Sequence, residues 1–259
     1  MSGSSNSCPS FNVLYLGQKP IGERCFDILL KDKSFNIRGA VSNKNIKDNW
    51  WKSNEVFVNS KTNNIRFIEN NNRNEHNIIN LIHKENINLI ISVQHSWIIS
   101  EQIINLVDGN ALNLHLAILP DYKAWNSFSH AIINGEKKYG TTIHWMTREL
   151  DEGAIALQKT FKIQPNDTAK SLYQKTYKIS YLLFSQFLLK LKQKKLKKIK
   201  QKSEGRQYNK HSLDEYRYIP LNKLNEKSDT IIRALYFPPY PPAYTIINNK
   251  KVELIPKSD

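Results

Sequence analysis

Short apolar runs that alternate with longer helical patterns constrain the fold of this chain more than any other feature. Residues 11–16 form a β-type run that ends at Gly17, and residues 21–30 then show helical spacing. Further along, Ile87 to Val93 is a nearly continuous apolar run, typical of a strand buried on both faces. Strands and helices that alternate in this way predict an α/β fold, with a mostly parallel sheet flanked by helices.

The same patterns divide the chain into segments. Further strands are expected at 36–42, 111–116, 141–146, 154–162 and 252–255, and further helices at 77–85, 100–106, 228–235 and from an N-cap at Asp167 or Thr168 to about Lys192. Two segments are expected to be irregular: the Asn-rich residues 63–74, and the proline-rich residues 236–244, because proline removes backbone donors. We therefore expect a disordered tail (1–10), an α/β domain (11–202) and a small aromatic and proline-rich C-terminal extension (203–259).

Composition narrows the class of protein. A chain of 259 residues that is 40% hydrophobic can bury a full core. No run approaches the roughly 20 apolar residues that span a bilayer, and the start lacks the pattern of a signal peptide. These features predict a cytoplasmic protein without membrane insertion. Cys8 and Cys25 lie in a polar tail and a predicted helix, which argues against disulfides and cysteine-based zinc sites, and we expect no metal.

The formal charge of +15 raises the question of a nucleic-acid partner. Much of this charge lies in the Lys-rich run at residues 190–200, at the end of a helical pattern. We interpret the run as a solvated helix end with the loop beyond it. Binding of phosphate-rich partners or of anionic membrane surfaces remains the alternative. We expect no nucleic-acid partner.

The candidate chemistry lies in the pattern Asn113-x-His115, followed later by Leu150-Asp151-x-Gly153. Side chains two residues apart on a strand project to the same face, so an amide and an imidazole can converge on one reacting atom. Such a pair suits acyl transfer, because it can stabilise the charge that develops on a carbonyl oxygen, and Asp151 can set the state of His115 or order a water. Each motif alone also fits an ordinary hydrogen-bonded pair or a common turn.

The surrounding residues make the pattern more specific. The segments 113–120, 129–135, 140–146 and 150–155 closely resemble the core of the folate-dependent formyltransferases, and the resemblance extends more loosely over about residues 11–200. It implies a Rossmann-like sheet and an N-formyltransferase catalytic domain at 11–202. It also implies that the family's Asn, His and Asp trio falls on Asn113, His115 and Asp151.

The same resemblance implies a formyl donor and its binding site. The donor is N10-formyltetrahydrofolate, which leaves as tetrahydrofolate, and its pterin is expected beside the trio. The residues that correspond to the pterin site are Gln94, His95, Ser96, Trp97, Ile98, Thr147 and Leu150. Trp97 fits equally well as a core residue, and His95 as a solvated loop residue.

Three kinds of acceptor compete within the family. The transfer-RNA enzyme has a further C-terminal barrel, for which too little chain remains here, and the glycinamide ribonucleotide enzyme has a Gly-Ser-rich loop that residues 17–23 lack. The resemblance therefore favours a dTDP-linked 3- or 4-amino dideoxy sugar, used for surface polysaccharides such as the lipopolysaccharide O-antigen. The expected acceptor residues are Tyr122, Lys123, Trp125, Asn126, Ser127, Arg233, Phe237 and Tyr240.

Other interpretations stay open. Phe237 and Tyr240 can simply pack over the sheet edge. A methionyl-tRNA formyltransferase-like enzyme, a basic RNA-binding protein, and a folate-binding module without turnover are the alternative functions. The complete trio argues against the last of these. The resemblance also suggests a homodimer.

Overall fold

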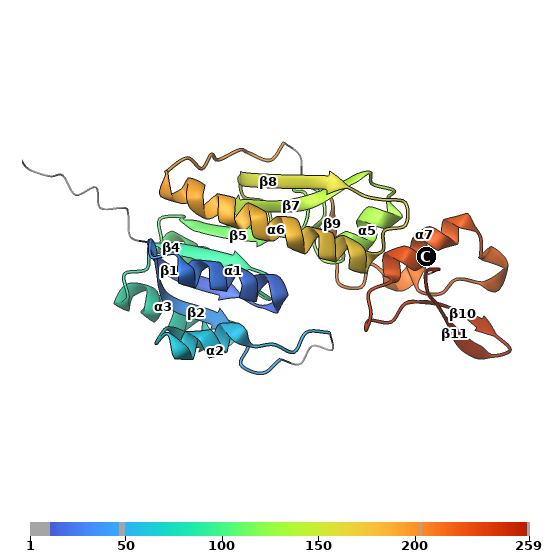
Figure 1. The fold of residues 1–259 in the computed structure, drawn as a ribbon, viewed down its shortest axis with the longest axis horizontal. Helices are drawn as coiled ribbons and strands as arrows, with labels where there is room; N and C mark the ends of the chain where they lie inside the picture. Colours follow the sequence, from blue (N-terminus) through green and yellow to red (C-terminus); the bar gives the residue numbers. More distant parts are fainter. Residues whose placement is uncertain (1–10, 47–49, 203, 258–259) are drawn as a thin grey trace, which may run out of the picture. The chain divides into compact units, whose positions relative to one another are not determined.

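The computed structural model describes residues 11–46, 50–202 and 204–257, so the predicted tail at 1–10 lies outside the described residues. Within them, the main sheet has the strand order β3-β2-β1-β4-β5-β7-β8 (Figure 1). The pairs β1–β2, β2–β3, β1–β4 and β4–β5 are parallel, which confirms the predicted fold class. The strands are β1 (Phe11–Gly17), β2 (Phe35–Ser42), β3 (Arg66–Glu69), β4 (Leu89–Val93), β5 (Ala111–His115), β7 (Lys138–Trp145) and β8 (Ile155–Lys162).

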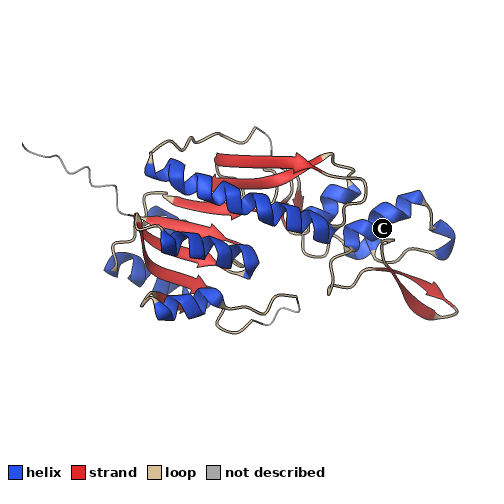
Figure 2. Cartoon of the chain, viewed as in Figure 1, coloured by secondary structure: helices blue, strands red, loops and turns tan. Residues whose placement is uncertain are grey.

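Helices connect most of these strands (Figure 2). They are α1 (Lys19–Lys31), α2 (Glu55–Thr62), α3 (Glu75–Lys84), α4 (Glu101–Asn105), α5 (Ser127–Ile133), α6 (Ala169–Lys192) and α7 (Glu226–Leu235), with 3-10 turns η1 (Asn72–Asn74), η2 (Asp214–Tyr216) and η3 (Leu221–Lys223). Two small sheets complete the described residues. One pairs β6 (Lys123–Ala124) in parallel with β9 (Gln207–Tyr208), and the other is the antiparallel hairpin of β10 (Ala243–Ile247) and β11 (Lys250–Leu254).

Contacts between residues divide the chain into two compact units. The first consists of Met1–His115, Ile143–Leu157 and Tyr181–Lys200, and the second of Leu116–Thr142, Gln158–Ser180 and Gln201–Asp259. This division interleaves the two units along the sequence. The predicted domain boundary after residue 202 stays a prediction.

The core of the first unit explains the apolar run at residues 13–16 of β1. Leu14 and Leu16 belong to a buried cluster with residues of α3 and α4, on one face of the sheet. The Tyr15 ring packs at a tilt against Phe26 of α1, with ring centres 5.1 Å apart, and both side chains are fully buried. Because successive residues of a strand point to opposite faces, residues 13–16 of β1 have to be largely apolar to bury both.

The second unit has a core of its own. Tyr139 of β7 and Leu172 of α6 are fully buried in one cluster, together with Ala234 of α7. At the start of α6, Ser171 N–H donates to Thr168 Oγ1 at 3.1 Å, and Thr168 N–H donates to Ser171 Oγ at 3.0 Å. These reciprocal bonds confirm Thr168 as the predicted helix cap.

Two predictions about irregular segments are wrong in part. The Asn-rich segment 63–74 contains β3, in which Phe67 and Ile68 pair with Ala40 and Val41 of β2. The prediction fails because β3 is a short strand at the edge of the sheet, so its apolar signal is brief. In the segment 236–244, β10 begins at Ala243, directly after the last proline of the run. The short helices α2 and α5 were also not predicted.

The Lys-rich run follows the predicted pattern, because α6 ends at Lys192 and the following residues are not helical. Within the first unit, Lys192 pairs with Asp32 at 2.6 Å, and the Lys198 ammonium lies 4.4 Å from the centre of the Trp145 ring.

No helix among the described residues is long and apolar enough to cross a membrane.

Candidate active site

The strand β5 presents two polar side chains at the carboxyl end of the parallel strands. Leu112 and Leu114 are 1% and 2% exposed, and Asn113 and His115 occupy the alternate positions. In the first unit, Asn113 contacts His144, and His115 contacts Asp151. The structure therefore agrees with the prediction that their side chains share one side of the strand. In open α/β sheets, ligands bind outside the carboxyl ends of the strands.

Asp151 joins these two side chains from the turn after β7 and forms a polar cluster with them. Its Oδ2 lies 3.5 Å from His115 Nδ1, and its carboxylate is almost completely buried. Asp151 adopts a left-handed backbone conformation with φ +58°. The turn is tight, since a Cβ on Gly153 would lie 1.7 Å from the Trp145 carbonyl oxygen. The structure thus brings the predicted trio together within one unit.

The cluster contains a fourth member that the sequence analysis missed. His144 of β7 is 2% exposed, and its Nε2 lies 3.1 Å from Asn113 Nδ2 and 3.4 Å from Asp151 Oδ1. Its Nδ1 lies 2.9 Å from the carbonyl oxygen of Trp145. A histidine on a predicted strand was the available signal. The sequence alone, however, does not show which strand neighbours β7 in the sheet.

The segment Gln94–Ile98 follows β4 and lies in the same unit as the trio. The Trp97 indole N–H donates to Asn70 Oδ1 at 2.8 Å, and Asn70 Nδ2 donates to Ser96 Oγ at 2.9 Å. Trp97 is partly buried against the core, whereas Ile98 is 60% exposed. Asn70 is a second residue that the sequence analysis missed, since it lies in the segment expected to be irregular.

His95 has unmatched hydrogen-bonding capacity. Both of its ring nitrogens are buried without a hydrogen-bond partner, and the ring packs edge-on against Trp97 at 4.7 Å. The alternative of a solvated His95 is therefore wrong for these nitrogens. Burial lowers the pKa of His95 to about 3, so the imidazole is neutral and offers one donor and one acceptor. These groups fit a heterocycle with donors and acceptors on its edge, such as a pterin.

The two remaining predicted pterin residues lie in the turn after β7. Thr147 Oγ1 donates to the carbonyl oxygen of Glu149 at 3.0 Å, and Leu150 directly precedes Asp151. Thr147 is exposed and Leu150 is partly buried. Their contact with a pterin stays a prediction.

The predicted acceptor residues of the loop after β5 belong to the second unit. In that unit, the loop forms hydrogen bonds with residues that follow residue 203. Tyr122 and Lys123 are 3% and 1% exposed, and the Lys123 ammonium donates to the Glu204 carbonyl oxygen. Burial, together with the Glu136 carboxylate that accepts the Tyr122 hydroxyl, raises the pKa of Tyr122. Asn126 Nδ2 lies 3.2 Å from the carbonyl oxygens of residues 209 and 210.

Other members of the predicted acceptor set differ in exposure. Ser127 is 8% exposed, whereas Trp125 is 49% exposed and Tyr240 43%. Phe237 packs against Tyr240 with ring centres 5.7 Å apart, and lies 5.5 Å from the Tyr173 ring. Packing of Phe237 is therefore present, and a role for these residues in acceptor binding stays a prediction.

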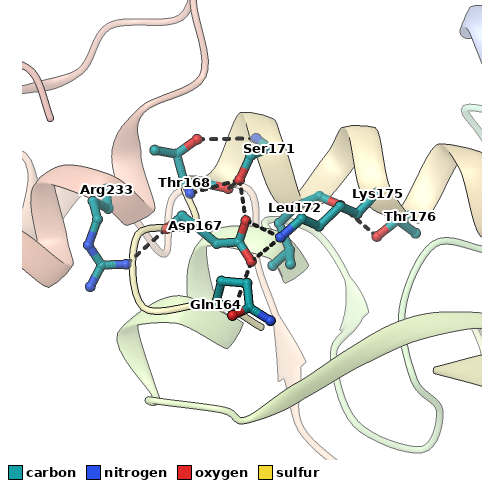
Figure 3. Close-up of polar contacts among 8 residues, drawn as sticks. All are labelled: Gln164, Asp167, Thr168, Ser171, Leu172, Lys175, Thr176 and Arg233. Atoms are coloured by element: carbon teal, nitrogen blue, oxygen red, sulfur yellow. Dashed lines mark hydrogen bonds and ion pairs between the residues drawn. The ribbon is translucent and has the colours of Figure 1, made fainter. Parts of the chain in front are cut away.

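Arg233, the last predicted acceptor residue, has partners in its own unit. Its Nε donates to Asp229 Oδ2 at 2.8 Å. Its Nη1 donates to the Asp167 carbonyl oxygen at 2.8 Å (Figure 3). Its role as a diphosphate ligand stays a prediction. Among the described residues, no group of three or more His, Cys, Asp or Glu side chains is arranged to hold a metal ion.

A buried carboxylate, two imidazoles and an amide at the carboxyl end of a parallel sheet define an α/β protein with a polar centre suited to acyl transfer. The formyl transferase family model matches residues 12–188. The chain belongs to the formyl transferase family.

Relatives and solved structures agree with this assignment. The chain is 33% identical over 177 residues to the GDP-perosamine N-formyltransferase of Brucella melitensis biotype 1, a match that covers 66% of this chain and 65% of the relative. It thus spans slightly less than two thirds of that relative's length. Methionyl-tRNA formyltransferases also match part of the chain.

Two crystal structures resemble nearly the whole chain. A 4-N formyltransferase from Francisella tularensis has a TM-score of 0.77 at 21% identity, covering 96% of this chain and 99% of the other. WlaRD, a sugar 3N-formyl transferase crystallised in the presence of dTDP and 5-N-formyl-THF, has a TM-score of 0.74 at 25% identity, covering 93% and 84%. The Rossmann-like fold predicted from the resemblance is that of these proteins.

Proposed function

We propose that this protein transfers a formyl group from N10-formyltetrahydrofolate to the amine of a nucleotide-linked amino sugar. The observation that carries the proposal is the buried cluster of Asn113, His115, His144 and Asp151 in the first unit. The match to a sugar N-formyltransferase over 66% of the chain supports the choice of acceptor.

The reaction requires stabilisation of one charge and transfer of one proton. The amine nitrogen attacks the formyl carbon, a new C–N bond forms, and negative charge develops on the formyl oxygen. Asn113 Nδ2 and His115 stabilise this charge, and removal of one such donor costs about 3–4 kcal/mol of transition-state stabilisation in other enzymes. The bond between the formyl carbon and N10 then breaks, and N10 gains the proton that the amine loses.

The His115–Asp151 pair transfers this proton from the amine to N10. His115 Nδ1 faces the carboxylate at 3.5 Å, and we assign the action on the substrates to the opposite ring nitrogen, Nε2. The distance exceeds that of an ideal hydrogen bond, as is common in catalytic sites without bound substrate. Asp151 fixes the imidazole orientation and stabilises the imidazolium that forms transiently.

The donor is assigned to the segment Gln94–Ile98 together with Thr147 and Leu150. The unpartnered ring nitrogens of His95 fit the polar edge of a pterin, and the exposed Ile98 can cover its face. Crystallisation of WlaRD with 5-N-formyl-THF supports a reduced folate as the donor.

The acceptor is proposed to be a 3- or 4-amino dideoxy sugar linked to a nucleoside diphosphate, used in surface polysaccharide synthesis. The GDP-perosamine relative and the dTDP present with WlaRD make GDP- and dTDP-sugars the first candidates. The exposed Trp125 and Tyr240 offer ring faces for a nucleobase. The same proposal includes a catalytic domain at 11–202 and a C-terminal extension at 203–259 that completes the acceptor site. It also includes a homodimer in the cytoplasm.

The test is a turnover assay with N10-formyltetrahydrofolate and a panel of GDP-, dTDP- and UDP-linked 3- and 4-amino sugars, read by product mass. Gain of one formyl group on one sugar is the expected result. His115→Ala should lower kcat by about 100-fold or more, and His83→Ala, at an exposed position on α3, is the matched control. Near-normal turnover of His115→Ala would contradict the assigned roles, and an unmodified panel would contradict the proposed acceptor.

The match to methionyl-tRNA formyltransferases favours a second candidate acceptor, initiator transfer RNA charged with methionine. Formylation of this RNA, with every sugar left unmodified, would replace the first proposal. Salt-dependent nucleic-acid binding without formyl transfer would instead favour a basic RNA-binding protein.

A further inference from the structure

His144 lies close to three polar atoms in the first unit, but only two of the three distances are those of hydrogen bonds. Its Nδ1 lies 2.9 Å from the Trp145 carbonyl oxygen, its Nε2 lies 3.1 Å from Asn113 Nδ2, and the same Nε2 lies 3.4 Å from Asp151 Oδ1. The first two distances are those of hydrogen bonds, whereas the third is longer than the usual range.

The carbonyl oxygen fixes which ring nitrogen of His144 carries the proton. A carbonyl oxygen only accepts hydrogen bonds, so Nδ1 must hold a hydrogen and donate it to Trp145. In the neutral ring Nε2 is then an acceptor, and it accepts from the Asn113 amide. This tautomer also explains the longer approach to Asp151, because Nε2 has no hydrogen to donate to the carboxylate.

The bond to His144 determines the orientation of the Asn113 amide. One N–H of Asn113 Nδ2 is held by His144 Nε2, which leaves the second N–H of the same nitrogen pointing elsewhere. Without the acceptor, the amide oxygen and nitrogen can exchange places by rotation about χ2, and an acceptor would then face the formyl oxygen. The acceptor at Nε2 therefore selects the rotamer in which Asn113 donates.

We propose that His144 is a positioning residue, which holds the Asn113 amide in its donating orientation and leaves the Asp151 carboxylate to His115. This inference rests on the proposed function for its catalytic consequence. Its structural part, the protonation of Nδ1 and the bond to Asn113, is independent of which substrate is used.

Two substitutions at the same position separate positioning from packing. His144→Met fills similar space without an acceptor at the Nε2 position, and His144→Gln can place its side-chain oxygen close to it. We expect His144→Met to lower kcat by about 100-fold, as for the loss of one oxyanion donor. The KM values for donor and acceptor should change little, and His144→Gln should recover about 10-fold of the lost kcat. Equal kcat values for the two variants would overturn the proposal.

Two further measurements keep the result interpretable. Thermal melts of both variants show whether either substitution impairs folding. If one does, kcat is measured on the folded fraction, in a double-mutant cycle with Asn113→Ala. The effect of His144→Met should largely disappear in the Asn113→Ala background, because both changes remove the same interaction. Full additivity would overturn the proposal.

Long-range 1H–15N spectra of the wild-type protein should show His144 protonated at Nδ1, and protonation at Nε2 alone would overturn the proposal even in a fully active enzyme. If the wild-type protein formylates no substrate on the panel, the proposed function fails. The spectrum then still decides whether the contact between His144 and Asn113 exists.

Discussion

The buried carboxylate of Asp167 is expected to be one of the strongest single contributors to the stability of the second unit. It is 3% exposed and accepts from Lys175 Nζ on both oxygens at 2.7 Å (Figure 3). Ser171 Oγ and the Gln164 backbone N–H each donate to it at 2.7 Å as well. The contacts from Ser171 and Lys175 secure the start of α6 to the loop before it, and the bond from Gln164 closes that loop on itself.

Asp167→Asn keeps the shape of this side chain and removes its charge. One carboxylate oxygen becomes an NH2 group that faces the Lys175 ammonium, so at least one charge-assisted bond, about 1.5–3 kcal/mol, is lost. Breaking a fully buried ion pair costs about 3–5 kcal/mol, but Lys175 is 38% exposed and regains solvation. We therefore expect a loss of about 3 kcal/mol, or a fall in Tm of about 6–12 °C for a chain of this size.

The assay is thermal and urea unfolding followed by far-UV circular dichroism at pH 7. Asp32→Asn is the matched control, because Asp32 pairs with Lys192 at 2.6 Å but both side chains are 25% exposed. Its cost should stay below about 1 kcal/mol. Equal destabilisation by the two substitutions would refute the reasoning from burial.

The pH dependence gives an independent check of Asp167. Burial alone raises the pKa of this carboxyl, and the bonds from Lys175, Gln164 and Ser171 lower it further than burial raises it. A lowered pKa in the folded state means that the stabilisation is complete above the unfolded-state value, near 3.9, and is lost as the pH falls through the folded value. The difference in Tm between wild type and Asp167→Asn should therefore shrink below about pH 4.

Two further predictions concern His130 and Gly153. Burial lowers the pKa of His130, which is stacked on Tyr208 at 3.6 Å, to about 4. The folded state then binds fewer protons than the unfolded state, so stability should decline as the pH falls from about 6.5 to 4, and His130→Phe should flatten part of that decline in Tm. An unchanged slope would contradict this account. Gly153→Ala would place a Cβ 1.7 Å from the Trp145 carbonyl oxygen and should lower kcat more than about 10-fold by moving Asp151. Gly109→Ala has nothing within 4 Å of the added carbon; its φ of +71° makes alanine strained there, which should lower stability but keep normal turnover of the folded protein, and equal kcat values for the two alanine variants would exclude the effect.

The parts of the site that follow from periodicity could be predicted from the sequence. Asn113 and His115 share a strand face because successive residues alternate, and Leu112 and Leu114 bury the opposite face. The contact with His144 could not be predicted in this way, since it depends on β7 lying beside β5 in the strand order. Strand order is set by long-range packing and leaves no local pattern in either strand.

The backbone conformation of several site residues could not be predicted from the sequence either. Gln94, Tyr122, Asn126 and Asp151, all predicted site residues, have φ values of +57°, +61°, +58° and +58°. Residues other than glycine enter this left-handed region at a cost of about 1–2 kcal/mol, somewhat less for Asn and Asp. Local preference therefore argues against the observed conformation at each position.

Such conformations persist only where surrounding contacts determine them more strongly than local preference does. Near Tyr122 and Asn126, these contacts are the pairing of β6 with β9 and the bonds from Asn126 to residues 209 and 210. At Asp151, the contacts are the tight turn at Gly153 and the approach of the carboxylate to His115 and His144. The conformations of these candidate site residues are thus determined by long-range contacts, which leave no local pattern in the sequence, so their geometry required the structure while their roles stay predictions.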